Sequence, residues 1–194
     1  MKKIIPLSLI VLGILCSTTL TAQISITPAR PENVDKQLIP YNGSRATWAC
    51  KATDSLSTQA IIVSRSAIDA PGDTLYIQSF VKKDGSYAPL WTTREVSATS
   101  KTIAFWGNRM AFFDADKDGN METLFIYSVQ DQPKGNDQFI HLVLHSKNEC
   151  YTIVSVKDPN TKKFTIDTYS PNFESLPESV KLRTLDFWNK LDKL

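Results

Sequence analysis

The sequence has little of what marks several common classes of protein. Among its 194 residues are 7 Gly, 10 Pro, 3 Cys and 2 His, and no segment repeats at a fixed period. With 42% hydrophobic and 22% charged residues, the composition is that of an ordinary globular chain. It excludes a low-complexity or disordered chain, a collagen-like repeat and a coiled coil, and the length suits one domain with a buried core. No P-loop, dinucleotide-binding fingerprint or set of zinc ligands is present.

An excess of charge of one sign is also missing. The chain has 22 Lys and Arg against 20 Asp and Glu, a formal net charge of +2. Lys2 and Lys3 lie in a segment that we expect to be removed. Its removal leaves 20 basic residues (22 − 2) and 20 acidic ones, a net charge of zero. A neutral chain is a poor candidate for binding nucleic acid or an anionic membrane surface.

The N-terminal segment, residues 1–22, is typical of a secretory signal peptide. Two lysines precede an apolar run over residues 4–15, and small and polar residues follow up to Ala22. The pattern predicts cleavage after Ala22 and a bacterial protein exported to the periplasm, the cell surface or the medium. The run is shorter than the ~20 residues that span a bilayer, and no later segment is apolar enough, so we expect no transmembrane helix. An uncleaved anchor is one alternative. A lipoprotein with lipid on Cys16 is the other, although Leu15 is larger than such processing requires.

Export to an oxidising compartment would allow the cysteines to form a disulfide. Cys16 leaves with the signal segment, whereas Cys50 and Cys150 remain in an oxidising compartment. The two lie 100 positions apart (150 − 50). A disulfide between them would stabilise the fold by about 4–5 kcal/mol in the chain-entropy model. Two separate buried thiols are the alternative, because two cysteines give no spacing pattern to check.

The chain after the signal segment has the pattern of a single β-rich domain over residues 45–194. Residues 23–44 carry three prolines and little periodicity, which predicts an extended leader. Strand-like segments separated by turn residues then follow one another. They cover residues 46–53, 59–65, 74–82, 87–95, 109–113, 123–129, 139–145, 150–156 and 164–169.

One of the turns predicts a specific pairing of strands. Asp84-Gly85-Ser86 stands between residues 74–82 and residues 87–95, and this arrangement favours a β-hairpin. The fold class is therefore mainly β, with antiparallel strands. A sandwich, an open barrel and a partial propeller-like meander all fit the pattern.

The pattern changes near the C-terminus, where residues 177–193 are predicted to form an amphipathic helix. Ser175-Leu176-Pro177-Glu178 fits a capping box with an early proline. Apolar residues then recur every three positions and form a stripe that should dock on the sheet, namely Leu182, Leu185, Trp188, Leu191 and Leu194.

The most informative segment is the acidic run from residue 114 to residue 122. Its carboxylates stand at positions 1, 3, 5 and 9, and Gly119 stands at position 6. Calcium takes six to eight oxygen ligands in a flexible shell, and a tight loop supplies them when alternate residues point inward. The predicted ligands are the side chains of Asp114, Asp116, Asp118 and Glu122 and the backbone carbonyl of Asn120. Four crowded carboxylates repel one another without a cation, and a structural Ca²⁺ ion is therefore expected here.

The loop differs from an EF-hand. An EF-hand needs a bidentate Glu at position 12 and a helix on each side, whereas position 12 here is Phe125 and both flanks alternate as strands do. The spacing D-x-D-x-D-G-x-x-E in a β-hairpin resembles the calcium loops of FG-GAP propeller blades, as in integrin α subunits. Those proteins repeat the blade, and this chain has one copy. A solvated acidic turn is the alternative, since Asp and Gly favour turns in any case.

A wider resemblance covers most of residues 46–191. It rests on the segment 74–81, Lys83-Asp84-Gly85-Ser86-Tyr87, Leu90-Trp91, the single acidic loop, the segment 142–145 and a final Phe187-Trp188-Asn189-Lys190. This succession is similar to a family of small exported bacterial proteins described as surface polysaccharide biosynthesis proteins. The resemblance implies a role in producing cell-surface glycan and names no reaction.

Several other residues have a functional and a plain interpretation. His141 and His145 on one strand would stand roughly 13 Å apart, too far to share a metal, so we expect them on a polar face with Ile140, Leu142 and Leu144 toward the core. Four tryptophans could stack against sugars, although packing in the core is the expected role: Trp48, Trp91, Trp106 and Trp188. Three carboxylates are free to serve a glycosidase, namely Glu95, Asp131 and Glu149, but the sequence does not place them together.

These observations carry two functional hypotheses. The first is an exported, non-enzymatic calcium-binding β module that binds a cell-surface glycan or an envelope protein. The second is an extracellular enzyme acting on glycan, with a site supported by calcium. The enzyme should have a pocket with perturbed carboxylates, whereas the module should have an exposed binding patch and no catalytic cleft.

Overall fold

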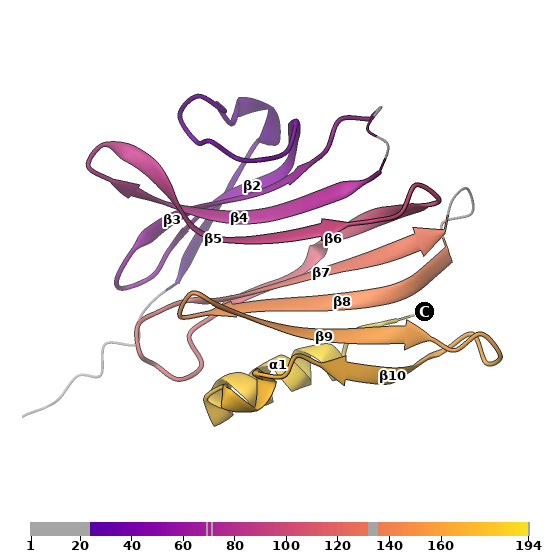
Figure 1. Cartoon of the computed structure of the whole chain (residues 1–194). Helices are drawn as coiled ribbons and strands as arrows, with labels where there is room; N and C mark the ends of the chain where they lie inside the picture. Colours follow the sequence, from indigo (N-terminus) through magenta and orange to yellow (C-terminus); the bar gives the residue numbers. More distant parts are fainter. Residues whose placement is uncertain (1–23, 69, 71, 132–135, 194) are drawn as a thin grey trace, which may run out of the picture.

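The computed structural model describes residues 24–193 except 69, 71 and 132–135, and its main elements are two antiparallel sheets and one α-helix (Figure 1). The predicted signal segment, residues 1–22, lies outside the described residues. Among the residues that are described, no helix combines the length and the hydrophobicity needed to cross a membrane.

The first sheet has five strands in chain order, each antiparallel to the one before it. They are β1 (Ser25–Ala29), β2 (Arg45–Thr53), β3 (Thr58–Arg65), β4 (Thr74–Lys83) and β5 (Ser86–Val96). The predicted β4–β5 hairpin is confirmed, and its two-residue turn has positive φ at Asp84 (50°) and Gly85 (85°). A turn of this kind matches the right-handed twist of the strands.

The second sheet is also a five-stranded meander. Its strands are β6 (Lys101–Phe113), β7 (Glu122–Asp131), β8 (Asn136–Ser146), β9 (Glu149–Lys157) and β10 (Phe164–Tyr169). Every segment predicted to be a strand lies inside an observed strand. The mainly β class with one C-terminal helix is confirmed, and the two sheets form no closed barrel.

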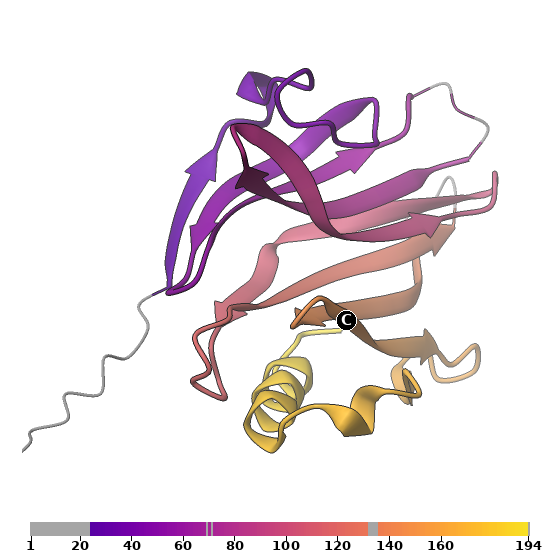
Figure 2. The same cartoon turned by 60° about the vertical axis from the view of Figure 1, so that its left-hand side comes forward.

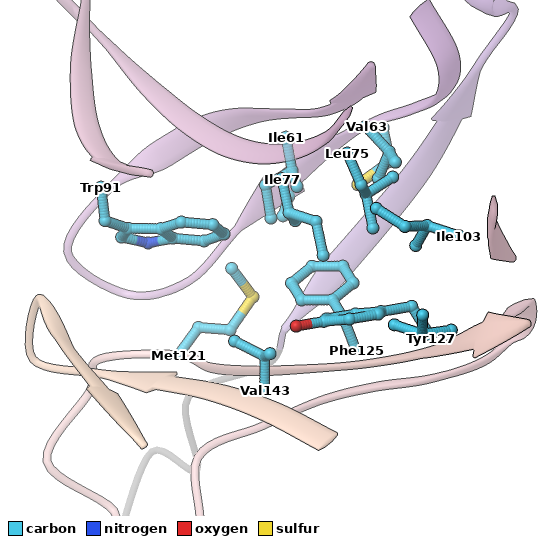
Figure 3. Close-up of a cluster of buried hydrophobic side chains, with 13 residues drawn as sticks. Ile61, Val63, Leu75, Ile77, Trp91, Ile103, Met121, Phe125, Tyr127 and Val143 are labelled. Carbon is cyan, nitrogen blue, oxygen red and sulfur yellow. The ribbon is translucent and has the colours of Figure 1, made fainter. Parts of the chain in front are cut away.

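The inner faces of the two sheets share one hydrophobic core (Figures 1 and 3). The first sheet contributes aliphatic side chains and the indoles of Trp48 and Trp91, and the second sheet contributes phenyl and phenol rings around Phe125. Fully burying one such side chain stabilises a fold by about 1.5–3 kcal/mol. The molecule is therefore a two-sheet sandwich, the first of the three architectures that the sequence left open. The buried side chains labelled in Figure 3 include Ile61, Val63, Leu75, Ile77, Trp91, Ile103, Met121, Phe125, Tyr127 and Val143.

Each sheet is also covered on its outer face (Figure 2). The helix packs on the outer face of the second sheet, where Leu124, Ile126 and Leu142 are fully buried. The leader packs on the outer face of the first sheet, over the buried Ile62 and Phe80. The chain thus forms four layers, with leader, sheet, sheet and helix in succession.

The leader holds more structure than its sequence indicates. Ser25–Ala29 is the edge strand β1, paired with β2, and a short 3₁₀ helix, η1 (Pro31–Asn33), follows it. Tyr41 is buried, and Val34 and Ile39 pack beside it. The leader therefore belongs to the domain rather than lying apart from it.

The C-terminal helix α1 (Glu178–Asn189) lies within the predicted range, but its start is not a capping box. The N-cap residue is Pro177, and no side chain caps the helix. Ser175 belongs to a preceding 3₁₀ helix, η2 (Phe173–Ser175), and its hydroxyl donates to the carbonyl of Asn172 at 2.7 Å. That capping prediction was wrong because the serine already serves the turn before the helix.

The helix docks through a face that differs in part from the predicted stripe. The buried residues are Val180, Thr184 and Trp188, and Leu191 follows after the helix, whereas Leu182 is 58% exposed. The Trp188 indole N–H donates to Asp167 on β10 at 2.7 Å, which fixes the rotation of the helix. Leu182 therefore faces solvent, contrary to the prediction, and Leu194 lies outside the described residues.

The two cysteines of the domain are free thiols. Cys50 on β2 is buried in the core between the sheets, and burial raises the pKa of its thiol to about 12. Cys150 on β9 is exposed. The disulfide that the sequence allowed is therefore not formed in this structure, which holds two separate thiols instead, only one of them buried.

Candidate metal centre

The acidic loop connects β6 to β7, as the strand-like flanks predicted. Phe113 at the end of β6 pairs with Glu122 at the start of β7. Eight residues therefore project from the end of the hairpin (121 − 114 + 1). Such a hairpin fixes both ends of the loop. The positions of the carboxylates along the sequence therefore determine where they lie relative to one another.

Three of the predicted ligands converge. Asp114, Asp116 and Glu122 each offer a carboxylate oxygen that lies within 4.8 Å of those of the other two. Asp114 and Asp116 are partly buried, and Glu122 is fully buried. Oxygen atoms of this kind at this spacing are the ligand set that a hard divalent cation prefers.

Glu122 is the most perturbed group of the cluster. One carboxylate oxygen accepts the Ala115 amide at 3.1 Å, and the other accepts the Ser146 hydroxyl at 3.2 Å. These neutral donors do not offset burial, which together with the nearby charges of Asp116 and Asp114 raises the pKa of Glu122 to about 7. A bound cation would remove this penalty.

Asp116 shows a second sign of incomplete solvation. Its Oδ1 atom is buried and has no hydrogen-bond partner, while its Oδ2 atom accepts from Lys147 Nζ at 3.1 Å. A buried polar atom without a partner is costly, and in a native structure it calls for an explanation such as an ion or a water. The position of this atom beside two further carboxylates favours an ion.

Asp114 shapes the loop as well as facing the cluster. Its two carboxylate oxygens accept the amides of Asp118 and Gly119, both at 3.1 Å. Gly119 has a φ of 89°, and a Cβ added there would lie 2.5 Å from Ser55 Oγ. The glycine is therefore needed both for the backbone conformation and for the close approach of another turn.

That other turn joins β2 to β3 in the first sheet. The Ser55 hydroxyl donates to the Gly119 carbonyl at 2.9 Å, and the buried Asp54 accepts the Met121 amide at 3.2 Å. The loop of the second sheet is thus anchored to a turn of the first. Sequence reasoning missed these anchors because they lie more than sixty positions away, and no local pattern marks them.

Asp118 is not part of the converging group, and its carboxylate is engaged by Asn120 and Lys147. Asp118 accepts the backbone and side-chain N–H groups of Asn120 at 2.8 and 3.1 Å, and it pairs with Lys147 at 2.7 Å. Partial desolvation acts to raise the pKa of Asp118, but the hydrogen bond from Lys147 holds it below its usual range. The Asn120 carbonyl as a calcium ligand stays a prediction.

Lys147 is a further residue of this centre that the sequence did not point to. It lies in the β8–β9 turn with a φ of 49°, and its ammonium bridges Asp116 and Asp118. Its own pKa is raised by these hydrogen bonds. The lysine neutralises part of the negative charge of the loop. Its ammonium lies between Asp116 and Asp118, where it would compete with a cation for these two carboxylates.

The histidines do not lie on a polar face, contrary to the prediction. Both faces of β8 are covered: Ile140, Leu142 and Leu144 pack under the helix, and His141 and His145 point between the sheets. His145 stacks on Trp91 at 3.8 Å and shares a hydrogen bond with Thr93 at 2.8 Å, and burial lowers its pKa to about 4. His141 stacks on Tyr127, whose hydroxyl donates to Glu95 at 2.7 Å.

The tryptophans serve the core rather than a stacking platform. Trp91 and Trp188 are buried, and Trp48 packs against Phe112 and Phe125. Trp106 packs in the cluster under the helix, and its indole N–H donates to Ser128 at 3.1 Å.

The three free carboxylates have separate partners. Glu95 accepts from Tyr127, Asp131 pairs with Lys101 at 3.1 Å, and Glu149 accepts from Tyr151 at 3.0 Å. Within the described part of the chain, the acidic loop holds the one group of three converging metal-binding side chains.

A small cavity adjoins the loop. Its volume is about 180 Å³, and it lies between the β2–β3 turn, the end of the acidic loop and the β8–β9 turn. Asp54, Asn120, His145 and Lys147 are among the residues that line it, with Trp91 on the apolar side.

The comparisons with known proteins return nothing to set beside this geometry. No protein-family model, no curated protein and no solved structure matches the chain.

Proposed function

We propose that the loop of residues 114–122 binds one calcium ion and that the protein is an exported, non-enzymatic β module. The single observation that supports metal binding is the convergence of carboxylate oxygens from Asp114, Asp116 and the buried Glu122. Within the described residues Glu122 has no basic partner at ion-pair distance, and Lys147 contacts Asp116 and Asp118 instead. A bound cation would give this buried carboxylate a positively charged partner.

Calcium fits the loop better than magnesium. The three carboxylates belong to one short loop with further carbonyl groups and exposed residues at its tip, which suits the six to eight oxygen ligands of calcium, whereas magnesium needs a strict octahedron and few protein ligands. Asp118 lies at the exposed edge of the loop, where it pairs with Lys147, and in the proposed site it leaves this lysine to supply a fourth carboxylate. We therefore propose Asp114, Asp116, Asp118, Asn120 and Glu122 as the calcium ligands.

The proposed role of the ion is structural. The loop contacts Ser55 and Asp54 from the first sheet and Ser146 and Lys147 from the second. An ion held there would fasten the ends of both sheets to the β6–β7 hairpin (Figure 1). Calcium is thus proposed to stiffen one end of the sandwich and the surface around it.

The biological setting is a proposal from the sequence. The N-terminal segment supports export, and the resemblance to surface polysaccharide biosynthesis proteins supports a glycan or an envelope protein as partner. A stiffened end of a β-sandwich is a suitable platform for such a partner, because loops carry binding residues when a rigid scaffold positions them.

Thermal unfolding tests the metal site. Ligand present at a hundred times its dissociation constant stabilises the folded state by about 2.7 kcal/mol, which in a domain of this size raises the melting temperature by about 5–10 °C. We expect this rise when calcium replaces EDTA, and no rise for the Asp116→Ala/Asp118→Ala variant. Asp131→Asn, which removes an acidic group from the far end of β7, should respond as the natural protein does. Equal melting temperatures in calcium and EDTA for the natural protein would refute the site.

A second candidate function is an extracellular enzyme acting on glycan, and the cavity of about 180 Å³ beside the loop is the observation that favours it. It contains a buried imidazole, His145, and a buried carboxylate, Asp54. The oxygens of Asp54 are already engaged by the amides of Leu56, Ser57 and Met121, which favours a structural role. Calcium-dependent release of reducing ends from bacterial surface polysaccharide, lost in His145→Ala, would support the enzyme. Binding without release supports the module.

A further inference from the structure

A second and larger cavity lies on the outer face of the first sheet. Its volume is about 720 Å³, within the range of pockets that hold small molecules. Strands β2 and β3 provide the floor, and the leader and the β4–β5 hairpin provide walls. Figures 1 and 2 show the leader and the curled end of this hairpin on the same outer side of the sheet. The cavity is thus a bowl built from three separate segments.

The interior of this bowl is mainly apolar. Val34 and Ile39 line it from the leader, Ala60 and Ile62 from β3, and Tyr87 from the hairpin. The same side chains form the hydrophobic cluster of this face, in which Ile62 is 1% exposed. An apolar surface in a concave site is stabilised by apolar ligand atoms rather than by water.

The charge at the edge of the bowl has one sign. Lys51 on β2 and Lys82 on β4 line the cavity, and both are exposed. None of the described residues that line it is acidic. Lysine stems can lie along apolar surface while the ammonium groups stay in water, so the two cations are free to meet a negative group at the mouth.

We propose that this cavity binds a single-chain amphiphile with an anionic head group, the chain lying against Val34, Ile39 and Ala60 and the head lying at Lys51 and Lys82. The apolar floor suits the hydrocarbon chain of this ligand, and the two lysines suit its anionic head group. The site is distinct from the acidic loop, and it stands or falls independently of calcium.

Displacement of a fluorescent fatty acid tests the chemistry of the ligand. Dansylundecanoic acid should brighten when it is added to the purified protein, and palmitate below its micelle concentration should displace it. Palmityl phosphate in a parallel arm distinguishes a carboxylate from a phosphate head group. Cetyltrimethylammonium, with the same chain length and a positive head, should displace the probe at least roughly tenfold less well. No brightening, or equal displacement by the cation, would overturn the proposal.

Variants test the place of binding. Ala60→Trp fills the bowl and should abolish binding of the probe. The double variant Lys51→Gln/Lys82→Gln should weaken palmitate roughly tenfold and leave cetyl alcohol unchanged, because each exposed ion pair contributes a modest amount. Lys83→Gln, one position further along β4 and outside the cavity lining, is the matched control and should bind as the natural protein does. Because the lysines are exposed, the double variant reports even if Ala60→Trp does not fold. Unchanged palmitate affinity in the double variant would contradict the placement of the head group.

Discussion

Glu122 makes the stability of the calcium-free protein depend on pH. Burial, reinforced by the charges of Asp116 and Asp114, raises the pKa of this carboxyl from 4.5 to about 7 in the folded chain. Ionisation therefore favours the unfolded state, where the carboxyl is solvated and keeps its ordinary pKa. The stability that the neutral carboxyl contributes is complete below pH 4.5, and it is lost as the pH rises through 7.

The size of the effect follows from the two pKa values. The two pKa values differ by about 2.5 (7 − 4.5), and a pKa difference of one corresponds to about 1.36 kcal/mol of free energy. Because Glu122 is fully buried, no discount for solvent screening applies. The free energy of unfolding should fall by about 3 kcal/mol between pH 4 and pH 8 from this group alone.

The isosteric variant Glu122→Gln isolates this contribution. Its amide oxygen still accepts the Ala115 amide, and its NH₂ group can donate to Ser146, but it carries no charge. Burial lowers the pKa of His141 and His145, and their titration raises stability with pH in both proteins, so it cancels in the difference. In urea unfolding with EDTA, the variant should gain about 3 kcal/mol relative to the natural protein from pH 4 to pH 8.

Calcium supplies the second half of this test. At pH 8 the ion should stabilise the natural protein and leave Glu122→Gln unchanged, because the variant lacks the buried charge that the ion compensates. A relative stability that stays constant to within about 0.5 kcal/mol across the pH range would refute the assigned pKa and the electrostatic account of the loop.

Three further predictions concern other parts of the molecule. Lys147→Met should tighten calcium binding, measured by calorimetric titration, because the ammonium no longer competes for Asp116 and Asp118; weaker binding would make the lysine a partner of the site rather than a competitor. Trp188→Ala should cost about 3–5 kcal/mol in urea unfolding, because the ring is fully buried, while Leu182→Ala on the exposed side of α1 should change stability by less than about 0.5 kcal/mol. A thiol reagent at pH 8 should label Cys150 in the folded protein and Cys50 only after unfolding, because burial raises the pKa of the Cys50 thiol to about 12; rapid labelling of both would contradict the placement of β2.

Local patterns predicted most of the fold. Alternation of apolar and polar residues placed the strands, and Asp84-Gly85 fixed one hairpin, because these signals depend on neighbouring residues alone. The edge strand β1 was missed, since Ser25–Ala29 contains a proline and pairs with residues 20 to 28 positions away (49 − 29 and 53 − 25). The docking face of α1 was wrong in part, because Asp167 on another element sets the rotation of Trp188.

The candidate site was predictable to a similar degree. The spacing of the acidic loop identified Asp114, Asp116 and Glu122, since one turn of a hairpin brings them together. Lys147 and Ser55 could not be found this way, because strand pairing and the packing of the two sheets bring them to the loop. The histidines of β8 were misplaced for a related reason. A polar residue within an alternating strand indicates solvent, and only the second sheet shows that this face is also covered.

The most direct test of the central claim is the calcium stoichiometry of the chelator-treated protein, measured by calorimetric titration at pH 8. We expect one ion for each chain, loss of binding in Asp116→Asn and in Glu122→Gln, and full binding in the control Asp131→Asn. The absence of binding by the natural protein at millimolar calcium would show that the acidic loop is a solvated turn and not a metal site. Binding that survives unchanged in Glu122→Gln would contradict the assignment of this buried carboxylate as a ligand.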